Sequence, residues 1–365
     1  MLHEEKPEFT GSMTRKALIA SGIGAVAALG LGRSALAQGA PNEATIQAAL
    51  KSGIPPDDGL AHPIPYTPPL GTGKDRGLAL GGGAIYLVSW YSGYFTSLAQ
   101  NGVDLKLADV MVGTSAGTLG NYAILMDTVA QMKSVMEGFG QNPASMNYSL
   151  APPFSAQRAG YVGNSLPTAS VANIQELGRA AMAAHTNPVP EWQAVITRLT
   201  GAGKAWPSPK YHTTANDCYT GQRLVVSQDD DVPAIDAMSA SSSWPGLAGP
   251  TPLKDRQAMD GGTCESSTHS DVVAGAKRVL IVSLASGDDA RDNAQGLRLG
   301  HFPNSLLQEV KNLKAGGSKV MLIVAGCPPG YEKISLVDPA LIPVAIKYGL
   351  DRGVSDAAKI REFLA

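Results

Sequence analysis

The residues LADVMVGTSAG, from 107 to 117, decide the fold. A short apolar run at 107–112 leads into the pattern Gly-x-Ser-x-Gly, and the following segment, 119–139, can form a helix. This order predicts a nucleophile elbow, a tight turn whose small residues let a strained serine stand above a sheet. A helix starting just after that serine would aim free N–H groups and its positive end at developing negative charge. The candidate residues are the nucleophile Ser115, the elbow glycines Gly113 and Gly117, and the backbone donor Ala116.

A glycine loop precedes the elbow. Three consecutive glycines end the apolar run at 77–80 and open a second helix-like segment. Their backbone N–H groups can converge on an anion, either a phosphate or the oxyanion of acyl transfer. The loop lacks the residues of a P-loop or a dinucleotide fingerprint. Because an elbow serine follows, we interpret it as an oxyanion loop, with candidate donors Gly82, Gly83 and Ala84.

A third motif places an acid before two glycines, in the sequence AMDGG. Asp260 ends a short apolar run, and Gly261 and Gly262 permit a close backbone approach. An Asp-Gly-Gly hairpin turn is the structural alternative. Upstream, residues 237–250 read AMSASSSWPGLAGP, a small-residue segment that could lie beneath a pocket.

Together these motifs resemble the patatin-like phospholipase family. GGGA, GTSAG, ASSSWPGL and MDGG occur in the family's order, and HTTANDCYTGQRLVVS at 212–227 is also similar. The resemblance covers about residues 76–285. It implies a three-layer α/β/α fold, a Ser-Asp dyad without histidine, and hydrolysis of acyl esters in membrane or neutral lipids. By position, Ser115 matches the nucleophile, Asp260 matches the aspartate, and Gly82 and Gly83 match the oxyanion loop.

Two adjacent positions depart from the family pattern. The family's glycine loop usually continues with a basic residue and another glycine, whereas this chain has Ile85 and Tyr86. How the loop is held is therefore a question for the structure.

Further apolar runs support an α/β fold. Runs at 224–227, 279–285 and 320–325 alternate with longer amphipathic segments, which indicates a mainly parallel sheet with helices on both faces. We expect an N-terminal extension with a signal peptide at 1–37, a Pro-rich linker or arm at 38–75, and one domain at 76–365. Aromatic residues at 86, 90 and 94 recur at helical spacing and favour a buried core position.

The N-terminal region has the order of an export signal. Arg15 and Lys16 precede an uncharged stretch at 17–32, and the small-residue site Ala-Leu-Ala ends at Ala37. A stretch of sixteen residues is marginal for spanning a bilayer of about 30 Å. We expect an exported protein that begins near Gln38; an uncleaved membrane anchor is the alternative.

The segment 142–170 holds several prolines and glycines, and we expect it to be irregular. A long loop of this kind is often a lid or a wall that contacts substrate. We expect it to cover part of an apolar pocket that binds an acyl chain.

Composition limits the partners. A 44% hydrophobic content supports a sizeable core, and a net charge of -2 gives no electrostatic case for nucleic acid. We expect a lipid substrate at a membrane or micelle surface, and neither cofactor nor metal. Cys218, Cys264 and Cys327 lack metal-site spacing, and we expect buried thiols, with one disulfide as the alternative in an exported protein. Residues 229–231, three adjacent aspartates, favour a solvated turn.

Two other functions remain open. An α/β-hydrolase with a Ser-Asp-His triad would recruit His269 or His301, which follow the acid in chain order. Both lie in polar stretches, so we expect solvated surface side chains. A non-catalytic lipid- or anion-binding protein would use the glycine loop alone, but such a protein needs neither Ser115 nor Asp260.

Overall fold

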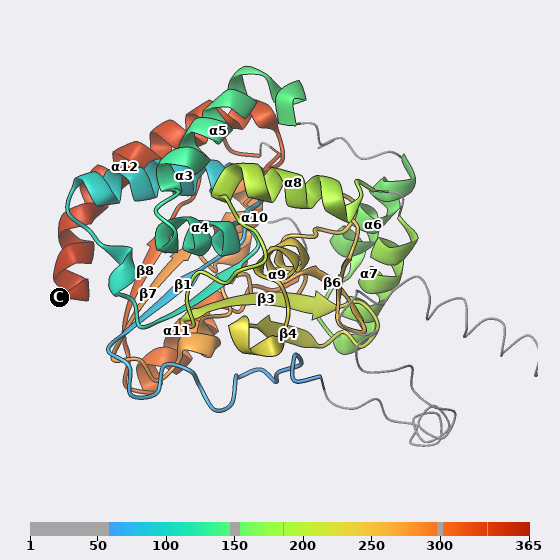
Figure 1. Cartoon of the computed structure of the whole chain (residues 1–365), viewed down its shortest axis with the longest axis horizontal. Helices are drawn as coiled ribbons and strands as arrows, with labels where there is room; N and C mark the ends of the chain where they lie inside the picture. The colour runs from blue at the N-terminus through green and yellow to red at the C-terminus, as the bar shows by residue number, and fades with distance from the viewer. Residues whose placement is uncertain (1–57, 147–153, 185, 298–301, 334) are drawn as a thin grey trace, which may run out of the picture. The chain divides into compact units, whose positions relative to one another are not determined.

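The computed structural model describes residues 58–146, 154–184, 186–297, 302–333 and 335–365 (Figure 1). The signal segment, its cleavage site and residues 38–57 of the arm lie outside these residues, and so does His301. Residues 58–365 form one unit. The remaining arm, 58–75, packs on it, since the Leu70 N–H donates to the Val272 carbonyl at 3.1 Å.

In the described part of the chain, eight strands form one sheet. Its centre is parallel, in the order β3-β2-β1-β7-β8, and β4, β6 and β5 add antiparallel pairs at the β3 edge. The strands are β1 (Arg76–Leu80), β2 (Val110–Thr114), β3 (Tyr211–Asp217), β4 (Arg223–Val226), β5 (Thr251–Leu253), β6 (Arg256–Asp260), β7 (Arg278–Ser283) and β8 (Lys319–Val324).

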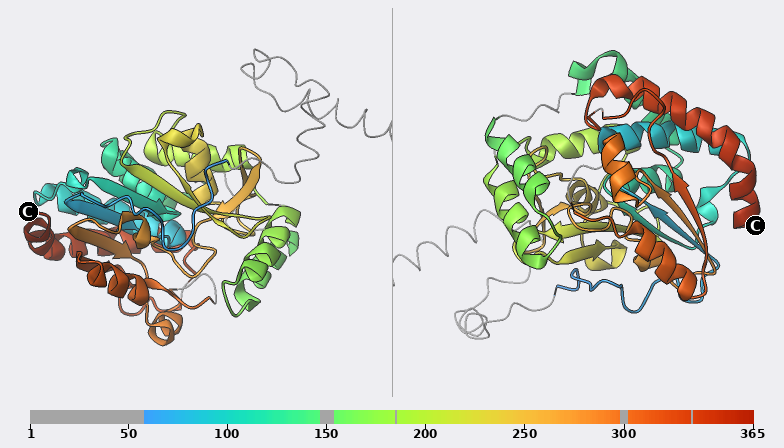
Figure 2. Two further views of the ribbon diagram at one scale, coloured as in Figure 1. Left: turned by 90° about the horizontal axis from the view of Figure 1, so that it is seen from below. Right: turned by 180° about the vertical axis from the view of Figure 1, so that it is seen from behind.

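Helices cover the sheet, as Figures 1 and 2 show. They are α3 (Ala84–Gln100), α4 (Ala116–Leu125), α5 (Val129–Gln141), α6 (Phe154–Ser165), α7 (Val171–Ala183), α8 (Val189–Thr200), α9 (Ala234–Ser241), α10 (Asp289–Gln295), α11 (Leu306–Ala315) and α12 (Ile342–Leu364). Short 3-10 helices are η2 (Leu105–Leu107), η3 (Pro143–Met146), η4 (Gln228–Asp230), η5 (Ser270–Val273) and η6 (Pro339–Leu341).

The strand period divides the core between two faces. Leu78 and Leu80 of β1 join an apolar cluster with α3, α4, α5, α8 and α12, whereas Ala79 joins another with η5 and α11. The fold is therefore three-layered α/β/α, as predicted. Tyr86, Trp90 and Tyr94 are buried in the first cluster, which confirms their core position.

The sheet register brings the motifs together. Leu80 of β1 is level with Gly113 of β2, so the glycine loop and the elbow leave the same edge. Thr114 of β2 pairs with Thr214 of β3, and the next β3 residue pairs with Asp260 of β6. Strand β3 therefore lies between β2, which leads to the serine, and β6, which ends at the acid.

Two expectations about helices are wrong. The segment 119–139 is not one helix, because α4 ends before Asp127, whose φ of 60° is left-handed. The segment 142–170 is not irregular throughout, since 154–165 form α6. Its prolines lie outside α6, and the interior Gly160 and Gly163 only weaken a helix.

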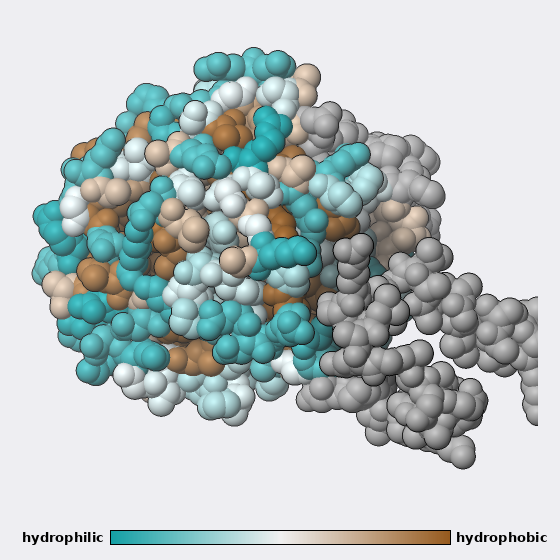
Figure 3. Space-filling view, viewed as in Figure 1, coloured by the Kyte–Doolittle hydropathy of each residue, from teal (hydrophilic) through white to brown (hydrophobic). Residues whose placement is uncertain are grey.

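None of the helices in the described residues is both long enough and apolar enough to cross a bilayer. On the face shown in Figure 3, hydrophobic residues are interspersed with hydrophilic ones.

We predict that Gly349→Ala destabilises the fold. A Cβ at Gly349 of α12 would lie 2.2 Å from the Trp90 carbonyl oxygen of α3, so the two helices would have to separate. The free energy of unfolding should fall by about 1–3 kcal/mol in urea titration. Gly138→Ala is the matched control, because its Cβ would meet no atom within 4 Å, and helix propensity favours it by up to ~1 kcal/mol. Equal effects of the two changes would contradict the prediction.

Candidate active site

Ser115 stands between β2 and α4 in a strained conformation. Its φ of 52° and ψ of −119° are rare for a residue with a side chain, and such strain is typical of functional sites. A Cβ at Gly117 would lie 2.0 Å from the Leu80 carbonyl oxygen, and one at Gly113 would lie 2.6 Å from the Thr118 Cα. Both elbow glycines are therefore required by close backbone approach.

Asp260 ends β6 and is 1% exposed. The Gly262 N–H donates to its Oδ1 at 2.7 Å. Burial raises the pKa of Asp260 to about 7, although the nearby Ser115 side chain and the Gly262 N–H act in the opposite direction. The carboxyl is thus a stronger base than an exposed aspartate.

Ser241, at the end of α9, joins the serine to the acid. Its Oγ accepts the Ser115 N–H at 3.0 Å, and its carbonyl accepts the Gly261 N–H at 3.3 Å. Asn216 of β3 adds to this support, since its Nδ2 donates to the Asp260 and Gly261 carbonyls, each at 3.1 Å. The sequence did not indicate a role for either residue, although both lie in segments that resemble the family, Asn216 in 212–227 and Ser241 in 237–250.

The glycine loop differs from the prediction at Gly82. Its N–H donates to the Ser267 carbonyl at 2.9 Å, so it is not free to meet an oxyanion. In the described chain the N–H groups of Gly83, Ala84 and Ala116 have no hydrogen-bond acceptor, because each stands at or before the first turn of a helix.

A buried tyrosine holds the loop. The Tyr91 hydroxyl of α3 donates to the Gly81 carbonyl at 3.0 Å, and the Tyr86 hydroxyl donates to the Gly326 carbonyl at 2.9 Å. Aromatic hydroxyls thus anchor this segment in a chain that lacks the family's basic residue at 85.

Two pockets meet at Ser115 and Asp260, and Trp244 lines both. One is lined mainly by apolar residues, and Asp260 is its only charged lining residue in the described chain. Its apolar lining residues are Ala84, Ile85, Val88, Ala116, Leu119, Met136, Phe139, Met146, Trp192, Val195, Leu199, Leu247 and Val337.

The second pocket has a mixed lining. Polar residues such as Glu265 and Asn304 border it, and α6 contributes Ala159, Gly160 and Gly163. The segment 142–170 therefore borders both pockets, because Met146 lines the apolar one.

Comparison with known proteins agrees with this arrangement. The sequence profile of the patatin-like phospholipase family matches residues 78–271, which is more than half of the chain and includes the loop, the elbow and Asp260. The chain belongs to the patatin-like phospholipase family. Membership supports lipid acyl hydrolysis at the level of the family.

Solved structures similar to this patatin-like chain are distant. VipD from Legionella pneumophila is 11% identical with a TM-score of 0.37, covering 78% of this chain and 67% of VipD. The type III effector ExoU is 15% identical with a TM-score of 0.29, covering 82% of this chain. The match spans 54% of ExoU. No curated protein matches the chain at a significant level.

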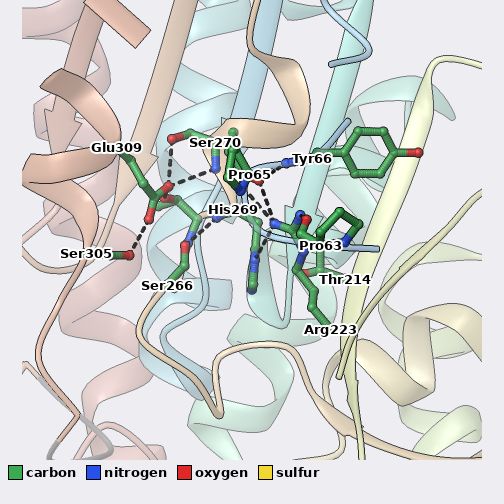
Figure 4. A network of polar contacts seen from close by, with 12 residues as sticks. Pro63, Pro65, Tyr66, Thr214, Arg223, Ser266, His269, Ser270, Ser305 and Glu309 are labelled. Atoms are coloured by element: carbon green, nitrogen blue, oxygen red, sulfur yellow. Dashed lines mark hydrogen bonds and ion pairs between the residues drawn. The ribbon is translucent and has the colours of Figure 1, made fainter. Parts of the chain in front are cut away.

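His269 of this patatin-like chain is fully buried, which contradicts the expected surface position. Its Nε2 lies 2.9 Å from the Gly261 carbonyl oxygen. Its Nδ1 lies 3.5 Å from Nη1 of Arg223, and Figure 4 shows these two side chains together. Neither Ser115 nor Asp260 is among its hydrogen-bond partners. The sequence missed the burial because the polar side chains of THSD pair inside the protein with residues that are distant in sequence, such as Arg223 and Glu309.

The cysteines of this patatin-like chain are free thiols, two of them buried and Cys327 partly buried. Among the described residues, no three histidine, cysteine or acidic side chains are grouped to hold a metal ion. Of the three adjacent aspartates, Asp230 accepts the N–H and the hydroxyl of Ser227, which makes it part of a capped turn.

We predict that Asp260→Asn stabilises the protein at high pH. An unfolded aspartate has a pKa of about 3.9, and the folded value is about 7. The neutral carboxyl therefore contributes stability that is complete below about pH 4 and lost as the pH rises through about 7. Asparagine stays neutral, so the variant should exceed the wild type by about 2–4 kcal/mol above pH 8 and match it near pH 4.

Urea titration at both pH values measures this difference. Asp255→Asn is the matched control, because Asp255 is exposed in the turn that precedes β6. A stability difference for Asp260→Asn that does not change with pH would contradict the raised pKa.

Proposed function

We propose that this protein hydrolyses fatty acyl esters of lipids, with Ser115 as nucleophile and Asp260 as its general base. The observation that carries the proposal is that the strained Ser115 lines the same two pockets as the buried carboxyl of Asp260, whose pKa is raised to about 7. A base is most effective when its pKa lies near the working pH. Family membership supports a lipid substrate.

The proposed reaction has two halves. The Ser115 Oγ attacks the acyl carbonyl carbon as its proton passes to the Asp260 carboxylate, and the carbonyl oxygen becomes an oxyanion. The leaving alkoxide takes the proton from Asp260 and departs as an alcohol, leaving an acyl-serine. Water then attacks the acyl group while Asp260 accepts a water proton, and the returning serine oxygen takes that proton as the fatty acid leaves.

The oxyanion needs donors that are fixed before the reaction. We propose the N–H groups of Gly83, Ala84 and Ala116, which have no acceptor in the described chain. Gly82 has a different role, which is steric: a Cβ at this position would lie 3.0 Å from the Ser115 Cβ. Its missing side chain lets the loop approach the nucleophile.

The apolar pocket supports an acyl-chain site. Each methylene that is buried contributes about 0.8 kcal/mol to binding. Because Asp260 is the only charged lining residue in the described chain, an acyl chain that enters this pocket does not remove water from any other charged side chain there. The second pocket, with its mixed lining, suits the alcohol part of the ester.

The triad alternative has less support. His269 hydrogen-bonds the Gly261 carbonyl rather than Asp260 or Ser115. His301 lies outside the described residues. A binding protein without activity would leave the strained serine and its carboxyl partner unexplained, and failure of a fluorophosphonate probe to label Ser115 would favour it.

The dyad predicts non-additive losses. Ser115→Ala and Asp260→Asn should each lower kcat for a p-nitrophenyl ester by about 10³-fold or more, and the double variant should be no slower than either. The kcat/KM of the wild type should rise with pH and level off above about 7, because the carboxylate form is required.

Asp255→Asn serves again as the matched control and should keep wild-type turnover. Circular dichroism must confirm that every variant is folded. Near-normal turnover of Asp260→Asn would rule out Asp260 as the base.

Chain length tests the acyl site. The kcat/KM for p-nitrophenyl esters should increase from the two-carbon to the eight-carbon acyl group, because each methylene enters apolar surroundings. Val195→Phe, which fills part of the pocket, should reduce hydrolysis of the eight-carbon ester more than that of the two-carbon ester. Val354→Phe, at an exposed position of α12, is the control. A flat profile would argue against the assignment.

A further inference from the structure

The contacts of His269 define its protonation. A carbonyl oxygen only accepts, so Nε2 must carry the hydrogen that bonds the Gly261 carbonyl at 2.9 Å. A guanidinium only donates, so Nδ1 must offer its lone pair to Arg223 at 3.5 Å. The imidazole is therefore neutral and fixed in one tautomer, in which Nε2 donates a hydrogen bond and Nδ1 accepts one.

The surrounding charges favour this neutral form. Burial lowers the pKa of His269, and the adjacent Arg223 lowers it further, whereas Asp271 and Glu309 act in the opposite direction. Both carboxylates are already committed. Asp271 accepts Arg223 at 2.8 Å, and Glu309 of α11 accepts the Ser270 N–H at 2.9 Å and its hydroxyl at 2.7 Å (Figure 4). The thiol of Cys264, 3.7 Å from Nε2, is held neutral because burial raises its pKa to about 12.

The arm before β1 closes this network from the other side. Arg223 donates to the Pro63 carbonyl, and the Tyr66 N–H donates to Asp271 at 2.8 Å (Figure 4). Arg223 is 4% exposed, so the pair with Asp271 is shielded from solvent on the arm side. The guanidinium therefore has a fixed place, and the His269 ring that faces it has one as well.

Gly261 links this network to the reaction centre. It directly follows Asp260, its N–H donates to the Ser241 carbonyl, and its carbonyl receives both Asn216 and His269. A Cβ at Gly261 would lie 2.5 Å from the Thr214 carbonyl oxygen, so the peptide has little room to move.

We propose that His269 is a positioning residue of the reaction centre. As a neutral donor it holds the Gly261 carbonyl, and this bond fixes the turn that aims the Asp260 carboxylate at Ser115. The inference rests on the proposed function of Asp260 as base. It gives a role to a side chain that the sequence had placed at the surface and that is hydrogen-bonded to neither Ser115 nor Asp260.

The test compares two side chains of similar size. His269→Gln keeps an N–H donor that can reach the Gly261 carbonyl, whereas His269→Met fills a similar volume without one. The φ of 45° at this position strains both equally. With a p-nitrophenyl ester, His269→Met should lower kcat about 10- to 100-fold at nearly unchanged KM, since small displacements of a catalytic group have effects of this size. His269→Gln should recover most of that loss.

The pH profile separates positioning from stability. The hydrogen bond from the Gly262 N–H lowers the pKa of Asp260. We expect His269→Met to loosen this bond and so raise that pKa. The acid limb of the kcat/KM profile should then move to higher pH. A merely less stable protein would keep the wild-type limb. If His269→Met does not fold, His269→Asn replaces it, because asparagine tolerates left-handed backbone and its amide ends short of the Gly261 carbonyl.

Ser115→Ala is measured beside these variants. Activity in Ser115→Ala would refute the proposed function itself. If Ser115→Ala is inactive, the inference is overturned when the variant lacking the donor has wild-type kcat and an unmoved acid limb, or when His269→Gln is as impaired as His269→Met. Loss without the donor, recovery with glutamine and a displaced limb support it.

Discussion

The site depends on one close approach, that of Gly117 to the Leu80 carbonyl, where a Cβ would lie only 2.0 Å from the oxygen. Because nothing projects from Gly117, α4 can begin directly behind β1, and Ser115 turns outward with a φ of 52°. The same approach keeps the glycine loop at the end of β1 beside the serine. The loop, the elbow and the mouths of both pockets thus follow from a single contact between backbones.

Burial gives Asp260 its chemistry and has a cost in stability. The carboxyl is 1% exposed, and the Gly262 N–H and the nearby Ser115 side chain only partly offset its desolvation. Support comes from neutral groups, namely the carbonyl of Ser241 and the amide of Asn216, rather than from a cation. A cationic partner would stabilise the charged form and make the carboxylate a weaker base. Among the described residues no cation pairs with this carboxyl, so its burial is not offset by an opposite charge.

The sequence predicted those features that depend on local pattern. The strand-turn-helix at Ser115, the parallel apolar strands and the buried aromatic face of α3 all follow from periodicity and glycine spacing. The sequence did not predict β3 as a buried central strand, because YHTTAND has the polar composition of an exposed strand. Its threonines are buried in the sheet, and Thr214 pairs with Thr114 at 2.7 Å. Long-range pairing of this kind leaves no periodic signal.

Other misses have the same origin. Gly82 was expected to face an anion, but its donor meets Ser267, which lies 185 positions further along the chain. The polar stretch around His269 was expected at the surface, but its partners come from β4, α11 and the arm. Local sequence indicates which groups are polar, and only the completed fold decides whether water or protein satisfies them.

The pairing of α3 with α12 has a consequence for how this protein is made. The aromatic helix α3 is synthesised early, and its partner α12 begins at Ile342, so more than two hundred residues must be added before the two can meet. Closing so long a loop is entropically unfavourable, and folds dominated by distant contacts form slowly. During translation Trp90 and Tyr94 stay without their final covering, so a nascent chain exposes the apolar face that a chaperone would recognise. Ser115 and Asp260 are therefore present in the growing chain well before α12, the helix that covers α3.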